Sequence, residues 1–91
     1  MVSLGLVGRS STYATRVVNA QTGRCLDSNA NRQVYTRTCN GGSYQEWRFT
    51  LYSYGWELKN VATGFCLDSN ANGVVYTRGC NGGNFQRWRI P

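Results

Sequence analysis

The chain is built from two copies of one sequence unit. Residues 16–49 align with residues 57–90 at a constant offset of 41 residues, without a gap, and 21 of the 34 aligned positions are identical. Similarity at a fixed period is the sequence signature of a repeat architecture, in which each unit buries its apolar face against its neighbours. We therefore expect one domain over residues 1–91, composed of a first repeat (about 12–50), a second repeat (about 53–91) and a short N-terminal leader (1–11).

Each repeat has the pattern of short β-strands. Residues 47–52 and 56–59 alternate between apolar and polar side chains, a period of two that is typical of half-buried strands. The runs Val-Tyr-Thr-Arg at 34–37 and 75–78 combine β-branched and aromatic residues, which favour strands. Clusters of glycine, asparagine and serine separate these runs and indicate turns. The sequence predicts an all-β fold with about four short strands per repeat and no confident helix.

The four cysteines indicate a disulfide framework. A 91-residue chain buries a limited core and gains from covalent links, and an even number of cysteines in so short a chain is typical of an oxidising, extracytoplasmic setting. We therefore expect a secreted protein. Repeat symmetry favours the local pairing, although four cysteines permit two other pairings. The expected disulfides are Cys25–Cys39 and Cys66–Cys80.

Composition argues against metal, cofactor and membrane functions. The chain has no histidine and no closely spaced cysteine pair, so a zinc site is not expected, and nothing in the sequence indicates a cofactor. No stretch is long and apolar enough for a membrane-spanning helix, so no membrane insertion is expected. The formal net charge of +6 suits acidic partners, but the basic residues are scattered singly, which favours a role in solubility.

A Q-x-W motif stands near the end of each repeat, at residues 45–47 and 86–88. Together with the strings T-G-x-C-L-D-S-N, V-Y-T and C-N-G-G, it resembles the ricin B-type lectins. The resemblance implies a β-trefoil, which needs three repeats, so two tandem repeats form an incomplete trefoil unless oligomerisation completes it. Either the sequence is part of a longer chain or the chains associate, and for association a homotrimer or a swapped dimer is expected. The fuller motif is most similar to members that bind high-mannose glycans, so mannose-type glycans are the expected partner.

The resemblance also implies roles for individual residues. Sugar-binding roles fall on an aspartate, a strand tyrosine, an asparagine and an aromatic residue in each repeat: Asp27, Tyr35, Asn40 and Tyr44, and then Asp68, Tyr76, Asn81 and Phe85. Structural roles in the core fall on Gln45, Trp47, Gln86 and Trp88. The sugar-binding set suits sugars, because a charged acceptor, an amide and a flat ring match hydroxyls and C–H faces.

The two repeats differ at positions that matter for binding. Phe85 lacks the hydroxyl that Tyr44 offers, so the second pocket is expected to bind more weakly or differently. Arg37 and Arg78 follow the strand tyrosines, where they could reach further sugar hydroxyls or a carboxylate on the glycan.

The sequence argues against catalysis. Without histidine, and with its cysteines oxidised, the chain has no Ser-His or Cys-His nucleophile pair. A glycosidase needs two facing carboxylates, but Asp27 and Asp68 occupy equivalent places in different repeats and are expected in separate pockets. Two other binding functions stay open. One is a basic nucleic-acid-binding β domain, against which the disulfides and the paired Asp/Asn pattern count. The other is a trefoil that binds protein and has lost sugar.

Overall fold

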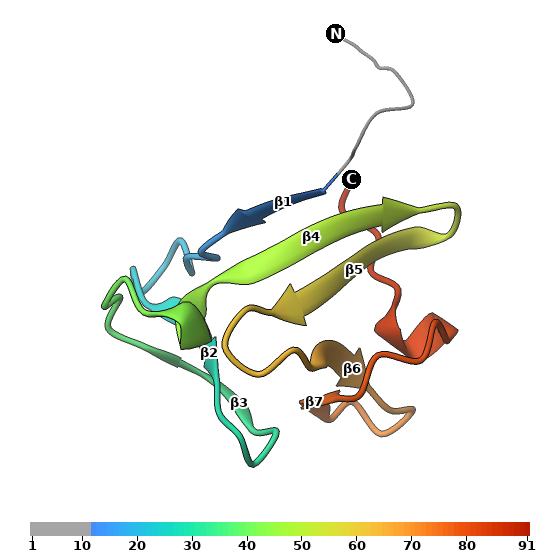
Figure 1. Cartoon of the computed structure of the whole chain (residues 1–91). Coiled ribbons are helices and arrows are strands. Elements are labelled where there is room, and N and C mark those ends of the chain that lie inside the picture. Colours follow the sequence, from blue (N-terminus) through green and yellow to red (C-terminus); the bar gives the residue numbers. More distant parts are fainter. Residues whose placement is uncertain (1–11) are drawn as a thin grey trace, which may run out of the picture.

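The computed structural model describes residues 12–91 and is all-β, as predicted (Figure 1). The predicted leader, residues 1–11, lies outside the described residues. Short strands follow one another along the chain, and a single 3₁₀ turn (η1, η2) stands near the end of each repeat. The elements are β1 (Thr12–Thr15), β2 (Cys25–Ser28), β3 (Val34–Arg37), η1 (Ser43–Gln45), β4 (Trp47–Tyr52), β5 (Gly55–Asn60), β6 (Cys66–Ser69), β7 (Val75–Arg78) and η2 (Asn84–Gln86).

The elements recur with the period of the sequence. β6, β7 and η2 begin 41 residues after β2, β3 and η1, respectively. β1, β4, β5, β6 and β7 form one antiparallel sheet in that order, while β2 and β3 pair as a separate hairpin. In Figure 1 the long strands β4 and β5 run side by side, and the β2–β3 and β6–β7 hairpins lie on the same side of them. Each repeat therefore contributes one hairpin to the side of the β4–β5 pair on which both hairpins lie.

The core lies between the β4–β5 pair and the hairpins. Trp47 and Phe49 of β4 point inward, as the period of two predicts, and Phe49 is paired with Leu58 of β5. Leu67 of β6 completes this buried cluster. Leu51 continues the apolar face of β4 but is exposed, because it lies toward the end of the β4–β5 hairpin. Burial of this cluster fixes which face of β4 looks inward, since successive strand residues face opposite sides.

The second repeat has fewer strands than the four expected. The first repeat contains β1 to β4, whereas the segment equivalent to β4 in the second repeat pairs at one position, Trp88 with Trp56. β4 lies between β1 and β5, and both neighbours pair with it over several residues. Within residues 12–91, the segment around Trp88 pairs with one neighbour only, β5. A strand extends only where neighbouring backbone groups satisfy its own.

Glu57 also departs from the sequence pattern. It was expected on the polar face of its strand, but it is buried. The Arg87 guanidinium lies 3.8 Å from the Glu57 carboxylate and also packs over the ring of Tyr52, 4.3 Å from its centroid. The carboxylate is thus paired with a partly buried cation near the end of the same repeat, which offsets part of the cost of removing the carboxylate from water.

Both predicted disulfides are confirmed. Cys25 is bonded to Cys39 and Cys66 to Cys80, with 14 residues of sequence separation in each pair. Each bond closes a loop within one repeat and joins the start of a hairpin to the segment after it. Each repeat thus has its own covalent link.

Removing one disulfide is expected to cost about 3 kcal/mol of unfolding free energy, because a closed loop of this length restricts the unfolded chain. The double substitution Cys25→Ala with Cys39→Ala tests this in the first repeat, and Cys66→Ala with Cys80→Ala is its matched counterpart. Urea unfolding followed by tryptophan fluorescence measures both. A variant as stable as the native chain would contradict the expectation.

Candidate functional site

The hairpin of each repeat brings an aspartate opposite the strand tyrosine. Asp27 pairs with Tyr35 across β2 and β3, and Asp68 pairs with Tyr76 across β6 and β7. Directly paired residues place their side chains on the same face of an antiparallel pair. A carboxylate and an aromatic ring from neighbouring strands therefore face the same side of each hairpin, as the sugar-binding set requires.

The asparagine of each Asn-Gly-Gly segment holds its own turn. Asn40 Oδ1 accepts a hydrogen bond of 2.8 Å from the Gly42 N–H, and Asn81 Oδ1 does the same with Gly83. The side-chain oxygen of each asparagine is thus engaged by the backbone, and the amide NH₂ is the group that can face a ligand. Gly41, which lies between Asn40 and Gly42, has a φ of 72°, a left-handed conformation that favours glycine.

The glutamine of each Q-x-W motif ties the site together. Gln45 Nε2 donates to Asp27 Oδ2 at 2.9 Å and to the Thr38 carbonyl at 3.0 Å, while its Oε1 accepts the Asn40 N–H at 2.8 Å. Gln45 is buried, so these bonds are shielded from water. It connects the aspartate of β2, the end of β3 and the asparagine turn. The glutamine is therefore a positioning residue that fixes the carboxylate.

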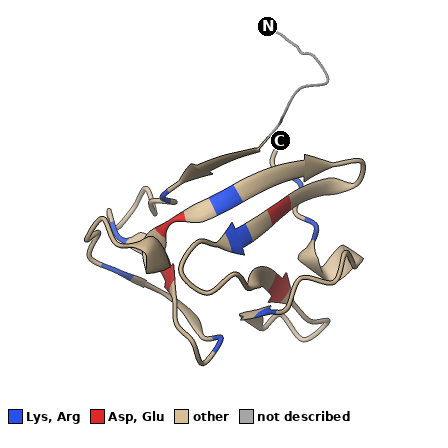
Figure 2. Cartoon of the chain, viewed as in Figure 1, with Lys and Arg blue, Asp and Glu red and all other residues tan. Residues whose placement is uncertain are grey.

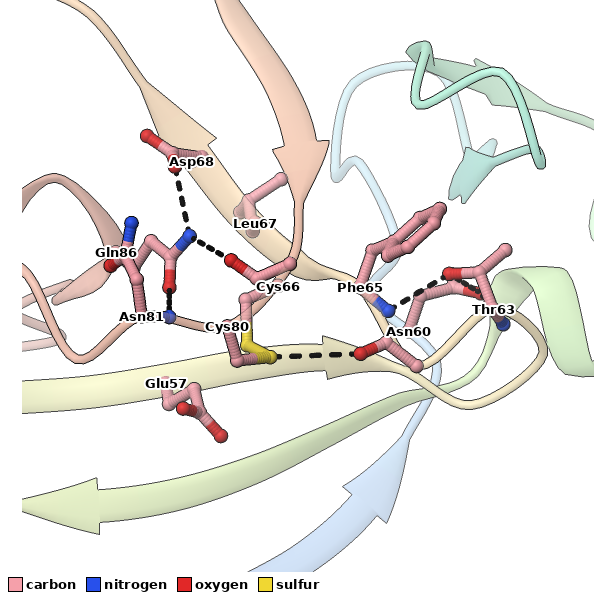
Figure 3. The surroundings of a disulfide bond; sticks show 12 residues. Glu57, Asn60, Thr63, Phe65, Cys66, Leu67, Asp68, Cys80, Asn81 and Gln86 are labelled. Carbon is pink, nitrogen blue, oxygen red and sulfur yellow. Dashed lines mark hydrogen bonds between the residues drawn. A yellow bond between two sulfur atoms is a disulfide. The ribbon is translucent and has the colours of Figure 1, made fainter.

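The second repeat repeats this arrangement (Figure 3). Gln86 Nε2 donates to Asp68 Oδ2 at 2.9 Å and to the Gly79 carbonyl at 3.0 Å, and its Oε1 accepts the Asn81 N–H at 2.9 Å. Figure 3 shows Gln86 between Asp68 and Asn81, beside the Cys66–Cys80 bond. Equal geometry in both repeats means that the 21 identities preserve a network as well as a fold.

The tryptophans of the motifs lie under the sites. The Trp47 indole N–H donates to the Leu26 carbonyl at 3.0 Å, and the Trp88 indole N–H donates to the Leu67 carbonyl at 3.1 Å. Trp47 is fully buried, as expected of a structural residue, whereas Trp88 is partly buried. Each ring anchors the backbone of the strand that carries the aspartate.

The two aspartates differ at Oδ1, the carboxylate oxygen that the glutamine does not contact. Both are buried, yet Asp68 Oδ1 accepts the Ser69 N–H at 2.7 Å, while Asp27 Oδ1 has no hydrogen-bond partner among residues 12–91. No fully buried side-chain oxygen or nitrogen of the described residues lacks a partner, so this oxygen keeps some contact with solvent, although Asp27 as a whole is only 3% exposed. The first repeat therefore keeps more acceptor capacity for a ligand.

The predicted residues of the first repeat line one small pocket. It has a volume of about 170 Å³, and its walls include Asp27, Tyr35, Asn40 and Tyr44. The same pocket is lined by Ser28, Asn29 and Arg37. Asn29 is a wall residue that sequence analysis did not single out, although its place in a turn cluster was visible. Its Oδ1 accepts the N–H groups of Asn31 and Gln33, so it shapes the turn beside the pocket.

The second repeat brings Asp68, Tyr76 and Asn81 together through the same pairing and the same glutamine. Its aromatic residue, Phe85, is 62% exposed, compared with 49% for Tyr44. Phe85 offers a ring face without a hydroxyl. The second site is therefore poorer in hydrogen-bonding groups than the first.

A wider, open groove of about 860 Å³ adjoins the first site. Tyr35, Arg37 and Asn40 line both the groove and the pocket, and Arg24 and Thr36 line the groove alone. The Arg37 guanidinium lies over the ring of Tyr35, 5.8 Å from its centroid. In the described part of the chain the single ion pair joins Arg87 to Glu57, so neither arginine of this groove has a carboxylate partner.

One group among residues 12–91 has the composition of a metal site, consisting of Glu57, Cys66 and Cys80. Both cysteines belong to the Cys66–Cys80 disulfide, and disulfide sulfurs are not the thiolates that metals bind. The group therefore does not fit a metal ion.

The basic residues are dispersed over the described chain rather than gathered in one stripe (Figure 2).

The chain matches a known protein family. The family model of the ricin-type beta-trefoil lectin domain matches residues 13–91. Among solved structures, the chain is similar to the designed 3-fold symmetric protein ThreeFoil, with a TM-score of 0.74 and 28% sequence identity. The match covers 84% of this chain and 62% of the designed protein, so this chain spans less than two thirds of its length. A search of the described helices for a candidate membrane span found none.

Proposed function

Because the chain belongs to the ricin-type β-trefoil lectin family, we propose that it is a non-catalytic lectin that binds glycans, of mannose type, through the pocket of each repeat. The observation that carries the proposal is the convergence of Asp27, Tyr35, Asn40 and Tyr44 on one pocket. The open carboxylate oxygen accepts sugar hydroxyls, the asparagine NH₂ donates to them, and the rings border the C–H face of the sugar.

The site favours binding over hydrolysis. Asp27 and Asp68 lie on different hairpins, and each is held by the glutamine of its own repeat. Glycoside hydrolysis uses two carboxylates that flank the same bond, about 5–10 Å apart. Two weak sites on one molecule instead raise the apparent affinity for a branched glycan, by as much as about 10²–10⁴-fold.

A glycan array at physiological salt tests the proposal. Selective retention of mannose-terminated glycans is the expected result. Selective binding of another sugar class would keep the lectin and overturn the mannose preference. A blank array with folded protein would overturn the lectin itself. Oligonucleotide binding that weakens steeply with salt would then favour a nucleic-acid-binding domain, since phosphate contacts carry that dependence.

The tyrosine of the first pocket offers a sharper prediction. Tyr44→Phe is expected to weaken glycan binding at the first site by about two- to tenfold, because one neutral hydrogen bond contributes about 0.5–1.5 kcal/mol. Phe85→Tyr is the reciprocal variant and is expected to strengthen the second site. Calorimetric titration with a mannose oligosaccharide measures both. Equal affinities for the native chain and both variants would contradict a role for the hydroxyl.

The proposal extends to assembly and location. The chains associate as a homotrimer or a swapped dimer, which supplies the third repeat that a trefoil needs. They are secreted, because two disulfides persist in oxidising compartments and are rare in the cytosol. Light scattering measures the first claim, since one chain has a mass of 10.2 kDa. A folded species of that mass at high concentration would contradict it.

A further inference from the structure

An arginine shares the first sugar pocket with the aspartate. Arg37 lines the pocket of about 170 Å³ together with Asp27 and Tyr35. It stands two residues after Tyr35 on β3, so the two side chains leave the same face of the strand. Because Tyr35 is paired with Asp27 across the hairpin, Arg37 lies on the diagonal from Asp27, about 7–8 Å away in an antiparallel pair. One face of the hairpin therefore carries both a negative and a positive group.

These two charges do not neutralise each other. In the described part of the chain the single ion pair joins Arg87 to Glu57, so no carboxylate of residues 12–91 is paired with the Arg37 guanidinium. Residues 1–11 contain no aspartate or glutamate. The carboxylate of Asp27 is held by Gln45 instead. A guanidinium offers five N–H donors in a planar fork that suits carboxylate and phosphate oxygens, and in Arg37 no acid of the chain uses it.

The ring of Tyr35 holds the arginine at the pocket. The Arg37 guanidinium lies over this ring, 5.8 Å from its centroid. A cation is attracted to the face of an aromatic ring, which favours side-chain conformations that keep the guanidinium beside the pocket. Tyr35 is itself half-buried, so the ring is anchored. The positive charge is thus in place before a ligand arrives, which lowers the entropy cost of binding.

The arginine stays accessible whether or not the neighbouring face of the hairpin is covered. The second repeat shows the covered case, because its Thr77 N–H donates to the Arg32 carbonyl of the first repeat and Thr77 is only 1% exposed. Arg78, the next residue and the equivalent of Arg37, is nevertheless exposed, as Arg37 is. Successive strand residues face opposite sides, so cover on one side leaves the arginine in water.

The second repeat lacks part of this arrangement. Among residues 12–91, no ring contact joins Arg78 to Tyr76, so its guanidinium is not held in the same way. Both Asp68 oxygens already accept hydrogen bonds from the protein. The first repeat alone therefore combines a carboxylate oxygen without a protein donor and a positioned cation in one pocket.

We propose that Arg37 determines specificity at the first site by binding an anionic substituent, a carboxylate or a phosphate ester, on the bound sugar. The inference rests on the proposed function and deepens it, because Asp27, Asn40 and Tyr44 bind the hydroxyls of the same sugar. The anion lies toward Arg37 and the hydroxyls toward Asp27, since a carboxylate accepts from a hydroxyl and repels a second anion. The expected ligand is a mannose-type glycan that carries an acidic group.

A matched series of sugars tests this preference. The methyl glycosides of mannose, mannose 6-phosphate and mannuronate share one ring and differ at C6, which carries a hydroxymethyl group, a phosphate ester or a carboxylate. In calorimetric titrations at low salt, at least one anionic sugar is expected to bind the native chain about tenfold more tightly than mannose. The preference is expected to shrink as salt is added, because ions screen an exposed charge pair.

The outcomes separate this inference from the lectin function. Tighter binding of the phosphate alone, or of the carboxylate alone, identifies the anion and supports the inference. Anionic sugars that bind no more tightly than mannose would overturn the inference and keep the lectin. A folded chain that binds none of the three sugars, and no glycan on the array, would overturn the lectin function and this inference with it.

Arginine variants locate the effect. Arg37→Gln is expected to lower the preference for the anionic sugar at least about fivefold and to remove its salt dependence. Arg37→Lys keeps the charge without the planar fork and is expected to retain part of the preference. Arg78→Gln makes the same change in the second repeat, and Arg48→Gln removes an exposed charge of β4 outside the pocket. A loss in either control as large as that in Arg37→Gln would overturn the proposal.

Discussion

Replacing Trp47 with alanine is expected to lower the free energy of unfolding by about 3–5 kcal/mol. Trp47 is fully buried in the core cluster with Phe49, Leu58 and Leu67, and its indole N–H donates to the Leu26 carbonyl. The substitution removes the largest fully buried side chain, leaves a cavity and frees a carbonyl beneath the aspartate strand. Small domains are stable by about 5–15 kcal/mol, so much of the margin is lost.

The second repeat provides the control. Trp88→Ala removes the same side chain and the equivalent bond to the Leu67 carbonyl, but Trp88 is partly buried and is expected to cost less. Urea unfolding followed by far-ultraviolet circular dichroism measures both variants. If Trp47→Ala proves unfolded in water, Trp47→Phe keeps most of the packing and is measured instead. A smaller loss for Trp47→Ala than for Trp88→Ala would contradict the described core.

The local parts of the fold could be predicted from the sequence. The disulfide pairing followed from two copies with one cysteine spacing, because a link within each repeat satisfies both copies alike. The burial of Trp47 and Phe49 followed from a period of two along one strand. In each case the information lies within a few residues or within one repeat, and chain geometry does the rest.

Contacts between repeats could not be predicted in this way. The string Val-Tyr-Thr-Arg occurs twice, yet Thr77 is buried and Thr36 is exposed. The difference depends on which hairpin lies over each copy, and identical residues carry no trace of that. The burial of Glu57 was also missed, although its partner Arg87 belongs to the same repeat, because the two residues are 30 positions apart in the sequence and their spacing does not reveal the contact.

The site shows the same division. Resemblance assigned Gln45 and Asp27 to separate roles, one structural and one sugar-binding. The hydrogen bond between them makes the roles interdependent, since the glutamine that frames the core also holds the carboxylate. Asp27 and Gln45 belong to different motifs, 18 residues apart, and this spacing alone does not reveal that their side chains are hydrogen-bonded. Binding and stability are therefore coupled in each repeat.

Asp27→Asn is expected to weaken glycan binding at the first site about ten- to a hundredfold, because hydrogen bonds to a charged group contribute about 1.5–3 kcal/mol. Asparagine keeps an oxygen that accepts from Gln45 Nε2, so the fold and the network are retained while the charge is lost. Calorimetric titration with a mannose oligosaccharide measures the affinity, and urea unfolding confirms that stability is unchanged.

Two matched variants give this result its meaning. Glu46→Gln removes one negative charge at an exposed position, so it separates loss of the site from a change in net charge. Asp68→Asn is expected to have the smaller effect of the two aspartate variants, because both Asp68 oxygens already accept hydrogen bonds from the protein. If Asp68→Asn instead abolished binding while Asp27→Asn left it intact, the principal sugar site would lie in the second repeat. The open oxygen of Asp27 would then have no part in recognition.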